Sequence, residues 1–98
     1  MSNFTELYKK IIVPILVKYA PDAKIILYGS RARGDAREGS DIDIALDAGY
    51  KMDTLIISNI VGDLEESSLP ICFDIVDFRT VAQEMQNRIL RDGIIWKK

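Results

Sequence analysis

Residues suited to binding phosphate groups stand together in the run Gly-Ser-Arg-Ala-Arg-Gly at positions 29–34. A strand that ends at Gly29 and leads into a helical turn exposes backbone N–H groups, which attract phosphate oxygens. Ser30 adds a hydroxyl donor. Arg31 and Arg33 can neutralise phosphate charge, and Arg33 can donate two parallel hydrogen bonds to a pair of phosphate oxygens. Because such turns and surface arginines also occur without a ligand, this run by itself indicates phosphate binding only weakly.

A second group of polar residues follows a short loop later, in Ser40-Asp41-Ile42-Asp43. Residues i and i+2 of a strand project to the same side, so Asp41 and Asp43 share a face. Neighbouring carboxylates repel each other unless a cation lies between them. Oxygen ligands suit Mg²⁺, which also takes substrate phosphates as ligands. The alternative is a solvent-facing edge strand with ordinary acids, or a turn that uses Ser40 and Asp41.

A third acid, Asp74, stands inside the apolar run 71–76, where a carboxylate is costly unless a cation or hydrogen bonds compensate for it. A neighbouring strand could bring Asp41 and Asp43 beside it. Three carboxylates that face a phosphate-binding turn suit two-metal phosphoryl or nucleotidyl transfer, and Asp74 could also accept the proton of the attacking hydroxyl. We therefore predict catalytic and metal-binding roles for Asp41, Asp43 and Asp74, and nucleotide binding by Gly29, Ser30, Arg31, Arg33 and Ser40.

The elements that must position these residues follow from the spacing of apolar side chains. Helical periodicity predicts an amphipathic helix that begins with Asn3 and Glu6 at capping-box spacing. Strands are expected where β-branched residues gather or alternate with acids. The predicted order is a helix over 3–20, strands over 24–28 and 41–47, a helix over 53–66, a strand over 71–77 and a helix over 80–91. This α-β-β-α-β-α order favours a small two-layer or three-layer α/β domain with a short mixed sheet flanked by helices. The apolar tail 94–96 is expected to dock onto the body or onto a partner.

Composition narrows the classes of function. With 98 residues, 48% of them hydrophobic, the chain is expected to form one domain over 1–98. A net charge of −2 argues against binding of duplex nucleic acid or a membrane surface. No apolar stretch approaches the roughly 20 residues of a membrane span, so a cytoplasmic location is expected. The absence of histidine excludes Ser-His-Asp and Cys-His nucleophile systems, and the single Cys72 is expected to be a buried small hydrophobe.

With these residues in view, the chain resembles a minimal nucleotidyltransferase of the DNA polymerase β superfamily. The family pattern is Gly-Ser, ten residues, Asp-x-Asp, and a third Asp on a later strand. Gly29-Ser30, Asp41, Asp43 and Asp74 satisfy this pattern. The resemblance covers nearly the whole chain, and it is greatest to small prokaryotic domains that are encoded beside HEPN-domain proteins and act as their antitoxins.

This resemblance implies a small nucleotidyltransferase fold and an ATP-using, Mg²⁺-dependent enzyme with two ions. It implies transfer of AMP to a tyrosine of a partner HEPN ribonuclease, encoded by the adjacent gene, which is thereby silenced. Relatives that modify other acceptors usually carry extra domains for acceptor contacts. This chain lacks them, so it is expected to borrow an acceptor surface from its partner or from a second copy of itself in a homodimer.

Two other functions stay open at this point. One is a non-catalytic antitoxin that neutralises its partner by steric occlusion. The other is the catalytic subunit of a two-chain small-molecule nucleotidyltransferase, of the aminoglycoside-modifying type. Neutralisation that requires Asp41 and Asp43 separates an enzyme from a steric blocker, and the neighbouring gene separates a protein acceptor from a small molecule.

Overall fold

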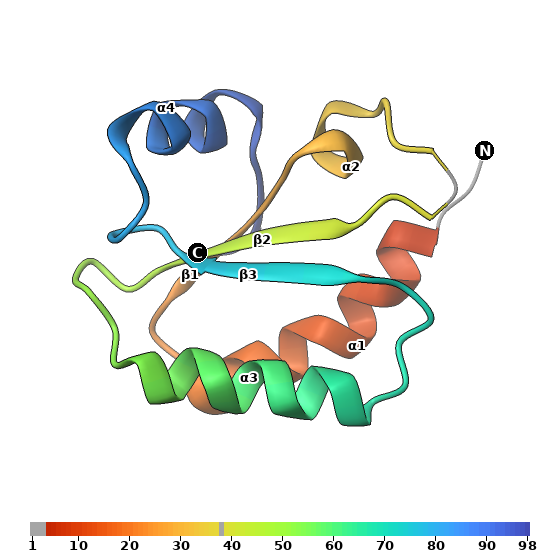
Figure 1. Cartoon of the computed structure of the whole chain (residues 1–98), viewed down its shortest axis with the longest axis horizontal. Coiled ribbons are helices and arrows are strands. Elements are labelled where there is room, and N and C mark those ends of the chain that lie inside the picture. Colours follow the sequence, from red (N-terminus) through yellow and green to blue (C-terminus); the bar gives the residue numbers. More distant parts are fainter. Residues whose placement is uncertain (1–3, 38) are drawn as a thin grey trace.

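Four strands form one mixed sheet in the computed structural model, which describes residues 4–37 and 39–98 (Figure 1). The elements in chain order are α1 (Phe4–Tyr19), β1 (Lys24–Tyr28), α2 (Ser30–Arg33), β2 (Ile42–Asp47), α3 (Thr54–Glu66), β3 (Phe73–Asp77), α4 (Gln83–Asp92) and β4 (Ile94–Lys97). The strand order across the sheet is β3-β2-β1-β4. β1 is antiparallel to β2 and β4, and β3 is parallel to β2.

Helices cover both faces of the sheet, with α1 and α3 on one side and α2 and α4 on the other (Figure 1). The alternation along β2 explains this, because Ile42, Ile44 and Leu46 are fully buried in the larger core with residues of α1 and α3. Ala45 faces the smaller cluster beneath α4, together with Ile89. No helix within 4–37 and 39–98 has both the length and the apolar character that a membrane crossing requires.

The predicted α/β fold with a short mixed sheet is confirmed, and the tertiary structure adds two elements to the predicted order. The helical turn after Gly29 is the four-residue α2, and the apolar tail is β4, which pairs with β1 through Ile26 and Ile95. The tail therefore docks onto the body. The last helix begins at Gln83 rather than at residue 80, because the N–H and hydroxyl groups of Thr80 both donate to the Asp77 carbonyl in a turn.

The prediction that Cys72 is buried is wrong, since its side chain is exposed. β3 begins one residue later, at Phe73, and β3 is an edge strand of the sheet. Cys72 therefore lies in the connection before the strand, although its carbonyl still accepts a hydrogen bond from the Ile42 N–H at 3.0 Å. The proposed capping residue Asn3 lies outside the described residues.

Two glycines in or beside helices predict opposite effects of an added methyl group. A Cβ on Gly93 would collide with the Ile89 carbonyl and lie 2.6 Å from Cγ2 of Ile26. Gly93→Ala is therefore expected to lower the free energy of unfolding by about 2–3 kcal/mol, through overpacking. Gly62, inside α3, has nothing within 4 Å of such a Cβ. Gly62→Ala is expected to raise the free energy of unfolding by about 0.5–1 kcal/mol, because alanine is the better helix former.

Urea denaturation of the two variants beside the wild-type chain measures both effects. The explanation from packing at Gly93 fails if Gly93→Ala is as stable as the wild-type chain, or if the two variants shift in the same direction.

Candidate active site

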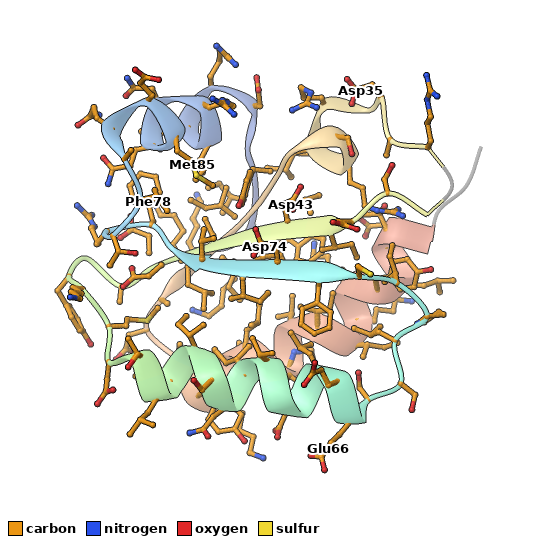
Figure 2. All side chains as sticks on the ribbon, in the orientation of Figure 1. Asp35, Asp43, Glu66, Asp74, Phe78 and Met85 are labelled. Atoms are coloured by element: carbon orange, nitrogen blue, oxygen red, sulfur yellow. The ribbon has the colours of Figure 1, made fainter. Side chains whose placement is uncertain are left out.

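Two of the predicted acids lie side by side on the sheet. Asp43 of β2 pairs with Asp74 of β3 in the parallel register, and Asp43 pairs with Tyr28 of β1 in the antiparallel register. Paired residues of neighbouring strands project to the same face. Figure 2 shows Asp43 and Asp74 on the side of the sheet that faces α2 and α4. The tertiary structure thus makes one row, Tyr28-Asp43-Asp74, across three strands.

The Asp43 carboxyl lies close to the negative charges of Asp74 and Asp41. Burial raises the pKa of its carboxyl above the ordinary value, and the charges of Asp74 and Asp41 raise it further, while Arg33 acts in the opposite direction. Burial, with the charges of Asp74 and Asp43, raises the pKa of the Tyr28 phenol to about 12, so that the phenol stays protonated at neutral pH. A cation at this position would relieve the repulsion between the carboxylates.

The carboxylate oxygens here are suitable ligands for Mg²⁺, although the side chains do not form a complete coordination site. In the described part of the chain, no group of three or more acidic or cysteine side chains is close enough together to hold a metal ion. Mg²⁺ commonly needs only one or two protein carboxylates, because waters and substrate phosphates complete its coordination. Asp43 and Asp74, with Asp41 directly before the start of β2, can supply those oxygens.

The turn before α2 is packed directly onto Asp43. Gly29 has φ 77° and ψ −159°, a conformation that essentially only glycine adopts. A Cβ at this position would collide with a carboxylate oxygen of Asp43. The Gly29 carbonyl accepts hydrogen bonds from the N–H groups of Ala32 at 3.1 Å and Arg33 at 3.0 Å. The absence of a side chain therefore allows the turn and the carboxylate to approach each other.

A cavity of about 310 Å³ opens between this turn, the sheet and α4. Several predicted site residues line it, and α4 adds others that the sequence analysis did not select. The lining residues are Tyr28, Gly29, Ser30, Arg33, Asp43, Met85, Arg88, Ile89 and Asp92.

Arg31 and Ser40 do not line the cavity, and their side chains are engaged elsewhere. Nε of Arg31 donates to the Ser40 carbonyl at 3.0 Å, and Nη1 donates to Oγ1 of Thr5 at 3.0 Å. Oγ of Ser40 accepts from the Arg37 N–H at 2.8 Å. The structure therefore does not support direct contact of Arg31 and Ser40 with nucleotide. Instead, these hydrogen bonds hold the loop that leads into Asp41.

Asp41 and Asp74 are exposed and are also absent from the cavity lining. Their charges nevertheless act on Asp43, so both carboxylates lie near the cavity floor that Asp43 provides. Of the predicted carboxylates, Asp43 alone lines the cavity in the described structure, and Asp41 and Asp74 are its exposed neighbours.

The contribution of α4 is the part of the site that sequence reasoning missed. Met85, Arg88 and Asp92 are spaced by three and four residues, which places them on one helix face. Ile89, only 1% exposed, anchors α4 in the cluster that contains Tyr28. The spacing of these three residues next to an isoleucine predicts a shared helix face. The neighbouring sequence does not predict that this face lies over β2.

Asp47 and Asp77, the last residues of β2 and β3, have structural roles away from the cavity. Asp47 accepts hydrogen bonds from the Gly49 N–H at 2.9 Å and from Nε of Arg79 at 2.8 Å. The Asp77 carboxylate accepts from the Met52 N–H at 2.8 Å and from the Arg79 N–H at 3.0 Å. Tyr50, which follows β2 in the sequence, is 66% exposed and does not line the cavity.

The ion pair of Asp47 and Arg79 predicts a loss of stability in acid. Burial alone would raise the pKa of Asp47, but hydrogen bonds from Arg79 and Gly49, with the charges of Arg79 and Lys24, outweigh it and lower the pKa. A lowered folded-state pKa stabilises the fold fully above the unfolded value of about 4, and this stability is lost as pH falls through the folded value.

Urea denaturation from pH 7 down to pH 3 should therefore show the stability difference between wild-type and Asp47→Asn shrinking below about pH 4. A difference that stays constant over this range would contradict the assignment to Asp47.

Comparisons with known proteins agree on one family. The sequence model described as polymerase beta nucleotidyltransferase matches residues 10–97. A Haemophilus influenzae protein named "Probable protein adenylyltransferase MntA" is 30% identical over 100 aligned residues, which cover 97% of this chain and 88% of the relative.

Solved structures of similar fold come from toxin–antitoxin systems. A toxin–antitoxin structure with AMP-PNP superposes with a TM-score of 0.76 at 27% identity, covering 90% of this chain and 71% of that chain. A second structure contains a tri-AMPylated Shewanella oneidensis HEPN toxin in complex with an MNT antitoxin. It superposes with a TM-score of 0.71 at 25% identity, covering 93% of this chain and 70% of that chain.

Proposed function

Because the chain belongs to the polymerase β nucleotidyltransferase family, we propose that it is a protein adenylyltransferase that transfers AMP from ATP to a tyrosine of a HEPN toxin and so acts as an antitoxin. The family also confirms the predicted enzyme class and the minimal nucleotidyltransferase fold. The observation that carries the proposal is the pairing of Asp43 with Asp74 below a cavity that Gly29, Ser30 and Arg33 also line.

Different residues in and beside the cavity bind the phosphate groups and the metal ion. The turn at Gly29 and the Ser30 hydroxyl offer donors to phosphate oxygens, and Arg33 offers a guanidinium that can bind two of them. Mg²⁺, held by Asp43 with Asp41 and Asp74, would supply charge neutralisation for the phosphate chain. Asp43 thus determines where the phosphate chain lies relative to the sheet.

In the transfer itself, the acceptor oxygen forms a bond to the α-phosphorus and the bond between the α- and β-phosphates breaks. Pyrophosphate leaves, and the proton of the acceptor hydroxyl passes to a carboxylate for which Asp74 is the best candidate. Asp74 is exposed and lies on β3, an edge strand, so a tyrosine on another protein can reach it. A base deep in the cavity would not be accessible to so large an acceptor.

The relatives support a HEPN toxin as the acceptor protein. The Shewanella antitoxin is bound to a HEPN toxin that carries AMP groups, and a HEPN toxin encoded by the adjacent gene is the corresponding partner proposed here. ATP is the proposed donor, since a related toxin–antitoxin structure contains AMP-PNP. A homodimer is a second way to complete the acceptor surface.

The test is the intact mass of the HEPN protein after incubation with this chain, ATP and Mg²⁺. A mass increase by whole AMP units, absent with EDTA and absent when the mapped tyrosine is replaced by phenylalanine, is expected. An unchanged mass in a stable complex that still loses ribonuclease activity would favour neutralisation by steric occlusion. Transfer of AMP to an aminoglycoside, but not to the protein, would favour the small-molecule enzyme.

A further inference from the structure

The cavity has a second arginine, Arg88 of α4, in addition to Arg33 of α2. The two residues come from elements on either side of the cavity, which also contains Asp43. The pKa of Asp92 shows that both arginines lie near its carboxylate. Its pKa is lowered first by the hydrogen bond from Arg91, and the charges of Arg33 and Arg88 add to that effect. Positive charge thus reaches the cavity from both sides.

Arg88 has no other evident task in the fold. Within residues 4–37 and 39–98 it makes no hydrogen bond or ion pair with another side chain, and it is exposed. Asp92 lies four residues further along α4, where a helix-surface pair with Arg88 would be expected. Instead, the two carboxylate oxygens of Asp92 accept from Arg91, at 3.1 and 3.2 Å. The Arg88 guanidinium is therefore available to a ligand.

We infer that Arg88 binds the phosphate chain of the nucleoside triphosphate from the α4 side, facing Arg33. The inference rests on the proposed function, because that function supplies the triphosphate. A guanidinium group can donate two hydrogen bonds to the oxygens of one phosphate group, so two arginines can hold a flexible phosphate chain between them. The cavity lining also contains the Asp92 carboxylate, which repels phosphate and lies on the same helix as Arg88. Arg88 offsets this repulsion on the α4 side of the cavity.

Isothermal titration with α,β-methylene-ATP and with AMP, both in Mg²⁺, tests this assignment without a protein acceptor. For Arg88→Gln we expect triphosphate binding to weaken about tenfold or more, because a charge-assisted bond is lost. AMP binding should change much less. Arg88→Lys, which keeps the charge without the fork, should lie between wild-type and Arg88→Gln. Lys10→Gln, on α1 below the sheet, removes the same charge and should bind like the wild-type chain.

A second variant tests how the negative charge of Asp92, on the same helix as Arg88, affects triphosphate binding. Asp92→Asn removes a negative charge from the cavity lining and is expected to tighten triphosphate binding severalfold. Thermal denaturation should show an intact fold for the Arg88 variants, since the Arg88 side chain is exposed, and it measures any loss of stability in Asp92→Asn.

The outcomes separate this inference from the proposed function. If the wild-type chain binds α,β-methylene-ATP and Arg88→Gln binds it equally well, the assignment of Arg88 is wrong and the proposed function stands. Equal losses for triphosphate and AMP would also overturn the assignment to the phosphate chain, and weaker binding by Asp92→Asn would overturn the charge balance. If the wild-type chain binds neither nucleotide, the proposed function fails and the inference fails with it.

Discussion

Asp43→Asn is expected to reduce AMP transfer on the order of a thousandfold while leaving the fold at least as stable as the wild-type chain. Activity should fall because Asp43 is the predicted carboxylate that lines the cavity in the described part of the chain, and the charges of Asp74 and Asp41 act on it. Stability should not fall, because burial and the two neighbouring charges raise the pKa of Asp43. A raised pKa means that the charged form is disfavoured in the folded state at neutral pH, and asparagine removes that charge.

Initial rates of AMP transfer and thermal denaturation, measured on the same preparations, test this expectation. Glu66→Gln is the matched control, because it also removes one negative charge but lies exposed at the far end of α3 (Figure 2). The control should keep wild-type activity. Substantial activity in Asp43→Asn would exclude Asp43 from the chemistry, and inactivity accompanied by a lower melting temperature would reduce Asp43 to a structural role.

Gly29→Ala is expected to damage stability and activity together. The substitution forces an alanine into a backbone conformation with φ 77°, and its Cβ collides with the Asp43 carboxylate. Backbone strain and overpacking together are expected to lower the free energy of unfolding by about 2–4 kcal/mol. Moving either the turn or the carboxylate also displaces the proposed phosphate donors at Gly29 and Ser30 relative to Asp43, so AMP transfer should fall at least about a hundredfold.

Gly49→Ala isolates the effect of the collision. Gly49 has a similar φ of 87°, but nothing lies within 4 Å of an added Cβ. This control should lose only about 1–2 kcal/mol, from backbone strain. A double-mutant cycle sharpens the test, since Asp43→Ala removes the carboxylate and should reduce the stability cost of Gly29→Ala. Equal losses in the two glycine variants, or a cost that Asp43→Ala does not change, would contradict a close contact between Gly29 and Asp43.

The sequence by itself determined the parts of the site that are local in the chain. The strand at 24–28 was predicted with its observed limits, and the strand at 41–47 began only one residue early. Alternation along that strand placed Asp43 on the face opposite to Ile42 and Ile44. These features could be predicted because the two-residue period of a strand depends on neighbouring residues alone. The spacing of Gly-Ser and Asp-x-Asp carried the family resemblance for the same reason.

Only the tertiary structure decided which distant elements meet at the cavity. Local sequence predicts a helix over 80–91, but burial of Ile89 against the sheet brings Arg88 and Asp92 to the cavity. The strand order leaves Cys72 exposed at an edge, and hydrogen bonds to Thr5 and Ser40 hold Arg31 away from the cavity. Local patterns specify backbone conformation and the face of each side chain. The choice of neighbours depends on burying apolar surface between segments far apart in the chain, and that becomes visible only once the layers have packed.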